Sequence, residues 1–511
     1  MKSIKYTGIC GVLCLLAACT DLTPEVFTDV RKEDYFQTTA QFSTLIANAY
    51  SQLAGEYGYI YREGYWSMQE YTTDEVVVPT RGTDWYDAGV PIAMHTQTWE
   101  TNTRDINNGW SFAYGGVTKC NTVIDNIHNL QGDDESTYSA AAKAGIAEAR
   151  VLRAFYHLLA MDLYGNVHVD DGSGEPVKQL TRKEVFEWIE GQILDNLDDI
   201  DDVVTYGNMT KPVAYMILAK MYLNAEVYTG TPRWEDCEKY CQLIIGGGYG
   251  YDLNEDYFTT FKKDNTGNKE IIFPIVFDQV YAQGNMFHLI TGHYVMQEAY
   301  GYLTQPWNGP CTLPSFYNSY SDDDKRKAQW FVGPIQKDGK TLQYQHSSWD
   351  APKDAIIVPE VTALQDPTAN NTFEGARFFK FEIEPGIEYH ANSDFPIYRY
   401  ADVLLMSAEA YMRQNGGSLD TDHLEYINKV HRRAGLKDYT AAEVTYDELL
   451  AERGRELAWE GHRRDDLIRF GKFTTGMWEF MDPRTKDREI FPIPDWVRDG
   501  APGVYQQNPG Y

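Results

Sequence analysis

Aromatic and charged side chains are combined in one loop-like segment, residues 72–89, which reads TTDEVVVPTRGTDWYDAG and is punctuated by proline and glycine. It contains Asp74, Arg81 and Trp85, and Trp99 follows in the phrase HTQTWETN. A tryptophan among short polar residues has little core to fill, and its flat face suits the C–H face of a sugar ring. Aspartate and arginine beside it can make paired hydrogen bonds to neighbouring hydroxyl groups. We therefore predict that Asp74, Arg81, Trp85 and Trp99 bind a glycan. The alternative, which applies most to Trp99, is packing inside the protein.

A second group of residues, His462–Asp466 (HRRDD), could be mistaken for an acid/base site. On helices, however, arginine and aspartate at these spacings more often tie neighbouring helices together by hydrogen-bonded ion pairs. Arg150 and Arg153, close to Glu148, invite the same interpretation. The sequence has no HExxH, GxSxG, P-loop or GxGxxG motif. We expect no catalytic residue, although the paired carboxylates of a glycosidase have no fixed spacing and leave that class open.

The N-terminus has the features of a secretory signal peptide, which we place at residues 1–18. Two lysines precede an apolar run, residues 9–18, that ends in small residues and is too short to span a bilayer. The tetrad LAAC that ends at Cys19 is typical of a bacterial lipobox, in which the cysteine is acylated after cleavage. Several acyl chains on Cys19 would hold the protein on a membrane, with residues 19–36 as a polar tether.

The charge balance is strongly acidic. The full chain of 511 residues carries 45 basic and 75 acidic residues, and loss of the two leader lysines leaves a net charge of −32. This charge argues against nucleic acid as a partner and against electrostatic attraction to anionic membrane surfaces, while it suits a neutral ligand. The 37 tyrosines, 22 phenylalanines and 12 tryptophans exceed what is usual, and exposed rings among them are what a sugar-binding protein needs.

The cysteines and acidic runs predict neither a disulfide framework nor a metal site. Three of the seven cysteines lie in the leader or at its end. Cys237 and Cys241 stand four apart on a predicted helix, where a bridge is awkward, and no histidine pair is near for zinc. The run Asp322–Asp324 lacks the alternation and the closing glutamate of a calcium loop, and we interpret it as a solvated turn. We expect no metal and no cofactor.

Helical periodicity returns along most of the chain and predicts a mainly α fold. The strongest segment is the alanine-rich run 140–164, which ends at the stop glycine Gly165. Further helices are predicted at residues 39–56, 181–200, 211–227, 234–245, 397–414, 420–434 and 446–470. Small and bulky apolar residues at helical steps favour close pairs, which resemble the stacked helical hairpins of tetratricopeptide repeats.

The pattern changes between residues 249 and 395. Short β-like runs such as 271–277 alternate there with loops rich in glycine and proline. We predict an N-terminal helical region at 37–248, an inserted loop-rich ligand-binding region with short strands at 249–395, and a C-terminal helical region at 396–511. Functional residues are more frequent on such loops than on the scaffold that carries them.

Several phrases of the sequence, in this order, resemble the SusD/RagB family. They are EARVLRAFYHLLAMDLYGNV, AKMYLNAEVYTG, NKEIIFPI, FPIYRYADVLLMSAEAYMR, INKVHRRAG, ELLAERGRELAWEGHRRDDLIRFGKF, FPIPDWV and QQNPGY. They span most of the chain that follows the leader. The order of the set, together with a lipoprotein leader, makes the resemblance specific.

The resemblance implies a tetratricopeptide-like helical scaffold whose irregular half carries a ligand site. It implies a partner as well, a SusC-like TonB-dependent transporter in the outer membrane that receives captured oligosaccharides or peptides. Members of the family place ligand contacts near the loop that contains Trp85. They also present aromatic residues from near the phrase TQPWNGPC, which adds Trp307 to the predicted glycan-binding residues. The aromatic residues around Trp307 do not align cleanly with the starch-binding members, so starch is not singled out as the ligand.

Two classes of function compete with this reading. A lipid-anchored glycoside hydrolase would have a similar acidic, aromatic-rich composition, and release of product from a glycan would distinguish it. A peptide-binding uptake protein of the RagB kind remains open as well. A solute-binding lipoprotein that feeds an inner-membrane transporter would need alternating strands and helices in two lobes, which the helical hairpins argue against.

Overall fold

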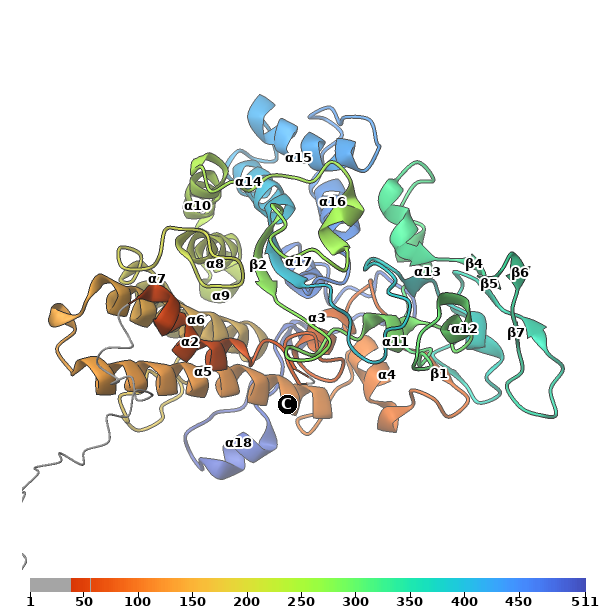
Figure 1. Ribbon diagram of the computed structural model, residues 1–511, viewed down its shortest axis with the longest axis horizontal. Coiled ribbons are helices and arrows are strands. Elements are labelled where there is room, and N and C mark those ends of the chain that lie inside the picture. The colour runs from red at the N-terminus through yellow and green to blue at the C-terminus, as the bar shows by residue number, and fades with distance from the viewer. Residues whose placement is uncertain (1–37, 56) are drawn as a thin grey trace, which may run out of the picture.

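The computed structural model describes residues 38–55 and 57–511 of the chain. The predicted leader, tether and acylated Cys19 lie outside the described residues. Helices predominate over strands, and Figure 1 shows the longer helices in the left and upper parts of the molecule, with most of the short strands at the right. No helix among the described residues is long and apolar enough to cross a membrane.

Antiparallel helices form the scaffold, as predicted. Neighbouring helices pack as α5 with α6, α6 with α7, α8 with α10, and α14 with α15. The longer helices are α2 (Thr39–Tyr50), α5 (Arg104–Gln131), α6 (Ala140–Tyr164), α7 (Arg182–Leu194), α8 (Lys211–Leu223), α10 (Trp234–Gly246), α14 (Tyr400–Gln414), α15 (Thr421–Arg433) and α16 (Tyr446–Leu457). The shorter ones are α3 (Tyr65–Glu70), α4 (Val90–His95), α9 (Ala225–Thr229), α11 (Phe287–Thr291), α12 (Met296–Tyr300), α13 (Pro314–Tyr317), α17 (Arg463–Arg469) and α18 (Asp495–Gly500).

Helix α6 lies at the centre of the N-terminal helices and has the predicted bounds. The Ser139 side chain accepts a hydrogen bond from the Ala142 N–H and caps the first turn, while Gly165 ends the helix with a positive φ of 69°. Close packing against α5 depends on Gly116, because a Cβ there would lie 2.4 Å from the Tyr156 ring. Glycine at this contact lets the two helices approach.

The strands are short, and each described strand pairs with only one other. All except β1 and β12 lie between residues 271 and 378, within the region predicted to be loop-rich. The longest pair, β2 (Ile271–Ile275) with β12 (Phe395–Arg399), is antiparallel. The others are the parallel pair β1 (Thr80–Arg81) with β10 (Gln365–Asp366), and the antiparallel pairs β3 (Trp330–Phe331) with β11 (Arg377–Phe378), β4 (Gly333–Pro334) with β9 (Ile356–Ile357), β5 (Gln336–Lys337) with β6 (Lys340–Thr341), and β7 (Gln343–Tyr344) with β8 (Lys353–Asp354).

Several predicted helix bounds were wrong. The segment predicted as one helix at 397–414 begins as strand β12 and becomes helical only at Tyr400. The segment predicted at 446–470 is interrupted between α16 and α17, where the buried Trp459 has a positive φ of 61°. Helix α5, the longest described, was not predicted at all.

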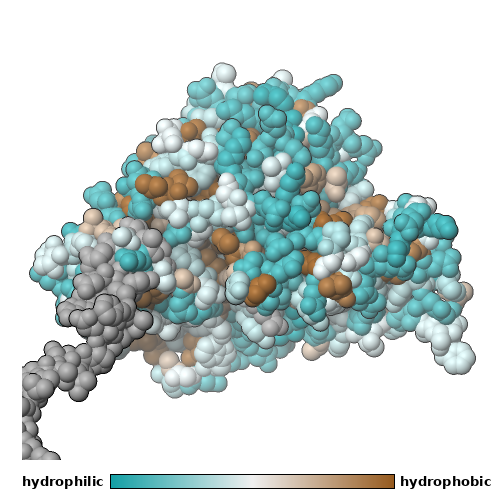
Figure 2. All heavy atoms as spheres, in the orientation of Figure 1, coloured by the Kyte–Doolittle hydropathy of each residue, from teal (hydrophilic) through white to brown (hydrophobic). Residues whose placement is uncertain are grey.

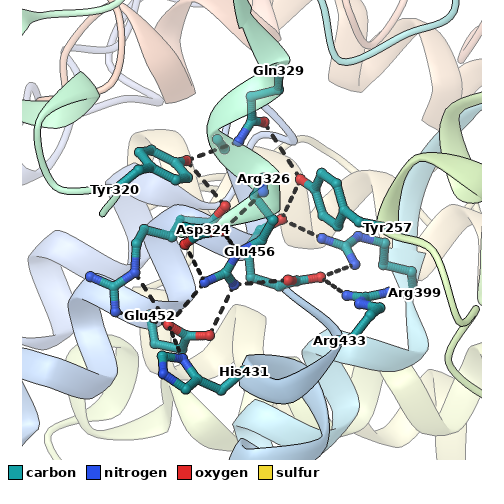
Figure 3. A network of polar contacts seen from close by, with 12 residues as sticks. Tyr257, Tyr320, Asp324, Arg326, Gln329, Arg399, His431, Arg433, Glu452 and Glu456 are labelled. Atoms are coloured by element: carbon teal, nitrogen blue, oxygen red, sulfur yellow. Dashed lines mark hydrogen bonds and ion pairs between the residues drawn. The ribbon is translucent and has the colours of Figure 1, made fainter. Parts of the chain in front are cut away.

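Buried ion pairs connect the inserted region to the C-terminal helices (Figure 3). Glu456 on α16 accepts hydrogen bonds from Arg399 at 2.6 Å and from Arg326 at 3.1 Å, and also pairs with Arg433. Arg326 pairs in addition with Glu452 at 2.9 Å. The side chains of Arg326, Arg399, Glu452 and Glu456 have no exposed surface. Because these charges come from separate segments, the network fixes how the segments sit on one another.

The network corrects the interpretation of Asp322–Asp324 as a solvated turn. Asp322 is exposed, but Asp324 is buried and its carboxylate pairs with the guanidinium of Arg326 at 2.9 Å. The prediction was wrong because the sequence does not distinguish the three aspartates, of which only Asp324 is buried.

The cluster His462–Asp466 plays the structural role that the sequence predicted. Arg464 pairs with Asp162 of α6 at 3.0 Å, and Asp466 pairs with Arg453 of α16 at 2.8 Å. Burial, reinforced by the positive charge of Lys220, lowers the pKa of His462 to about 3. The imidazole therefore stays neutral inside the protein and is out of reach of a substrate.

Arg150, Arg153 and Glu148 connect α6 to other segments, as the sequence predicted. Arg150 pairs with Glu135 outside α6, and Arg153 donates to Asn121 of α5 at 2.8 Å. Glu148 instead accepts a hydrogen bond from Tyr50 of α2 at 2.7 Å. All three side chains connect α6 to other segments, as helix-locking residues do, but not through each other.

Candidate functional site

An open hollow lies between the loop that carries Trp85 and the loop that carries Trp307. Its volume is about 320 Å³, within the range of small-molecule sites. The two tryptophans come from segments more than 200 residues apart, and the hydrogen bond from Trp85 Nε1 to the Trp307 carbonyl is 2.7 Å long. The hollow is lined by Arg62, Asp84, Trp85, Asp87, Tyr294, Gln305, Pro306 and Trp307.

The Trp85 loop has an uncommon backbone conformation. Trp85, Asp87 and Ala88 have φ values of 61°, 42° and 54°, a left-handed region that residues other than glycine seldom adopt. Each such residue costs free energy, and clusters of them are found where the surrounding structure fixes a functional loop. Gly309 contributes to this fixation, because a Cβ at that position would lie 2.2 Å from the Trp85 ring.

Arg81 holds the loop that carries Trp307 through hydrogen bonds to its main chain. Its side chain is buried, and its guanidinium donates to the carbonyl oxygens of Asn308 at 2.8 Å, Gly309 at 3.0 Å and Glu374 at 2.9 Å. Asn308 and Gly309 directly follow Trp307, and Glu374 lies further along the inserted region. The bonds hold Trp307 in place beside Trp85, so Arg81 supports the hollow without lining it.

Polar groups surround the two indole rings. The guanidinium carbon of Arg62 lies 5.3 Å from the Trp307 ring centroid and 6.0 Å from that of Trp85. The Tyr294 hydroxyl donates to the carboxylate of Asp84, which is exposed. The hollow thus combines flat apolar faces with carboxylates, a guanidinium and an amide. Together these groups can accept hydrogen bonds from hydroxyl groups and donate hydrogen bonds to them.

Two of the other predicted ligand residues lie elsewhere. Asp74 is held by Arg463 through two hydrogen bonds of 2.7 Å and lines a separate hollow. The Trp99 side chain is 1% exposed, and its Nε1 donates to the Tyr511 hydroxyl at 2.6 Å. Glycan contact by Asp74, Arg81 or Trp99 stays a prediction, but their pairing and burial favour a supporting role.

Six residues that line the hollow were not predicted to bind a ligand, and three of them, Asp84, Asp87 and Pro306, are close neighbours of the two predicted tryptophans. Gln305 is two positions before Trp307, so its segment had been singled out although the residue itself had not. Arg62 and Tyr294 carry no such signal, because they come from segments without a distinctive motif. Only the fold brings them to the two tryptophans.

The described residues hold no group of three or more histidine, cysteine, aspartate or glutamate side chains that could bind a metal ion. Cys120, Cys237, Cys241 and Cys311 are free and buried.

Comparison with known families gives two matches that together cover most of the chain. A family model described as "SusD family" matches residues 312–511, and one described as "Starch-binding associating with outer membrane" matches residues 26–223. The starch-binding protein SusD of Bacteroides thetaiotaomicron is 27% identical over 374 residues, which are 65% of this chain and 66% of that protein. SusD-like protein P2 of Formosa agariphila is 23% identical and matches over the full length of both chains.

Solved structures show the same fold. The surface glycan-binding protein A from Bacteroides thetaiotaomicron superposes with a TM-score of 0.74 at 23% identity, covering 93% of this chain and 100% of that one. The same protein in complex with laminarihexaose gives a TM-score of 0.71 at 21% identity, covering 92% and 100%. The predicted fold class is therefore confirmed.

Proposed function

Because the chain belongs to the SusD family, we propose that it is a glycan-binding protein of the outer membrane, which captures oligosaccharides and passes them to a SusC-like TonB-dependent transporter. The observation that carries the proposal is the hollow formed by Trp85 and Trp307. Relatives that are described as starch-binding and glycan-binding, one of them crystallised with laminarihexaose, support the ligand class.

Binding in this proposal breaks no covalent bond. The C–H faces of sugar rings stack on the indoles of Trp85 and Trp307, while Arg62, Asp84 and Gln305 exchange hydrogen bonds with hydroxyl groups. The loops are held before a ligand arrives, so little additional ordering is needed on binding. The relatives described as binding proteins support a function without catalysis.

A screen of the purified full-length protein in detergent tests the function. Native gels that contain one polysaccharide each, with starch and laminarin among them, are expected to retard the protein in at least one case. The retained glycan should keep its length and gain no reducing ends. Failure of every glycan to retard the protein would contradict the proposal and favour a peptide ligand, and shortening of a glycan would favour the hydrolase.

Acylation of Cys19 is the proposed means of attachment. In cells that express Cys19→Ser, the protein is expected to leave the membrane fraction and to lack the mass of the acyl chains, because one side chain supplies the whole anchor. Fractionation with mass spectrometry measures both. Cys14→Ser, five residues earlier in the leader, should remain in the membrane with wild-type mass, and an unchanged Cys19→Ser would argue against the lipobox.

A further inference from the structure

A second and larger hollow adjoins Trp307. Its volume is about 830 Å³, and its walls come from α2, from β2 with the segment 276–286, and from Tyr389 and His390. Its lining is mostly apolar, with Ser51 and Gln283 among the polar members. The segment after β2 is fixed to the segment that follows α2, since the Gly55 N–H donates to the Gln283 carbonyl at 2.6 Å.

The two hollows are connected through shared residues. Trp307 lines both of them. A small depression between them shares Arg62 with the hollow at Trp85 and Met286 with the larger one. The shared residues therefore place the three depressions next to one another, and Trp307 lines two of them.

Two exposed tyrosines, Tyr281 and Tyr389, line the larger hollow but not the hollow at Trp85. The side chain of Tyr281 is 93% exposed and that of Tyr389 is 45% exposed. A tight turn presents Tyr281, because the Asp278 carboxylate accepts the N–H groups of Val280 and Tyr281 at 2.6 Å each. A ring that a fixed turn holds in solvent, as with Tyr281, adds little to packing and is suited to stacking on a ligand.

The face of the molecule drawn in Figure 2 is not uniformly apolar. Figure 2 shows separate brown patches across the middle of the face, set among hydrophilic residues. A broad, stable protein interface is more often one continuous apolar patch with a polar rim. Alternation of apolar and polar surface fits a sugar chain, whose rings present C–H faces and hydroxyl groups in turn.

We infer that the two hollows form one extended groove for a linear oligosaccharide, which lies across Trp307 and stacks on Tyr281 and Tyr389 at its far end. The inference rests on the proposed function and adds to it the length of the ligand. The part of the groove at Trp85 holds the first rings, and the tyrosines are reached only by a longer chain.

Calorimetric titration of the full-length protein with a short and a long ligand tests this. The ligands are laminaribiose and laminarihexaose, or maltose and maltohexaose, according to the polysaccharide that retards the protein. Tyr281→Ala, and the double variant with Tyr389→Ala, are expected to bind the hexasaccharide about tenfold more weakly, with unchanged affinity for the disaccharide. Trp85→Ala should weaken both ligands. Trp496→Ala, which removes a half-exposed ring on α18, should weaken neither.

The results separate this inference from the proposed function. Normal binding of the hexasaccharide by both tyrosine variants, alongside weaker binding by Trp85→Ala, would overturn the extended groove and leave the function intact. Equal weakening of both ligands would overturn it too. An absence of glycan binding by the wild-type protein would overturn both.

Discussion

The Glu456→Ala variant is expected to lose about 3–5 kcal/mol of unfolding free energy, because it leaves buried arginines without their carboxylate. Arg399, Arg433 and Arg326 all pair with Glu456, and none of their side chains is more than 4% exposed. Domains are usually stable by about 5–15 kcal/mol, so the loss would be a large part of the total. Urea denaturation followed by circular dichroism measures it.

Two comparisons make this result specific. Asp447→Ala, on the same helix, removes an ion pair with Lys472. The Asp447 side chain is 77% exposed, so this variant should cost less than about 1 kcal/mol of unfolding free energy.

The stability that Glu456 contributes should depend on pH. Burial raises the pKa of Glu456, but Arg433, Arg399 and Arg326 outweigh it and lower the value to about 2. The ion pairs should therefore stabilise the fold fully above pH 4.5, the ordinary pKa, and lose their effect as the pH falls towards 2.

Glu456→Gln is expected to show a weaker dependence of stability on pH in that window, since its side chain does not titrate. If Glu456→Ala were no less stable than Asp447→Ala, the network would not hold the inserted region to the scaffold as described.

Loss of both indoles, Trp85→Ala with Trp307→Ala, is expected to weaken glycan binding by about a hundredfold or more, which abolishes retardation in the gel. Each single variant should cost about tenfold, since each removes one stacking face. Trp85 Nε1 donates to the main-chain carbonyl of Trp307, which the alanine variant keeps. Direct coupling between the side chains should then be modest, and a double-mutant cycle measures it.

Trp85→Phe serves as the matched variant because it keeps a flat ring and loses only the N–H donor. It should bind more tightly than Trp85→Ala. All variants should unfold at wild-type urea concentrations, since both side chains are only partly buried. Wild-type affinity in the double variant would exclude this hollow as the glycan site.

Local signals in the sequence were sufficient for some elements and not for others. Helix α6 could be bounded because Ser139 caps it, alanine fills it and Gly165 ends it. Helix α5 contains asparagines and glycines, which favour helices weakly, and its stability comes from packing against α6. All five residues of β12 are buried, and a short segment that is buried throughout has no periodicity that distinguishes a strand from a helix; pairing with β2 decides.

The candidate site, too, could be predicted only in part, because local signals identify some of its residues and not others. Residue type and loop context indicated Trp85, and the family resemblance indicated Trp307; the structure places them side by side. Asp74 and Arg81 belong to the same loop as Trp85, yet Asp74 pairs with Arg463 and Arg81 binds main-chain carbonyls. Which way a loop side chain turns depends on partners hundreds of residues away, and no local pattern records them.

The charge network also limits which parts of this protein are interchangeable with those of its relatives. The segment from β2 to β11 contributes Asp324 and Arg326, whereas Glu452 and Glu456 belong to the helix that receives them. A graft of this segment from another protein would take the Arg326 guanidinium away from the buried carboxylates of Glu452 and Glu456, unless the donor also carried an arginine at that position. Glu456 would then keep only Arg399 and Arg433, and Glu452 would keep Arg455. Ligand preference could therefore be transplanted by exchanging the exposed loops around Trp85 and Trp307, but not by exchanging the whole segment without its matching helix.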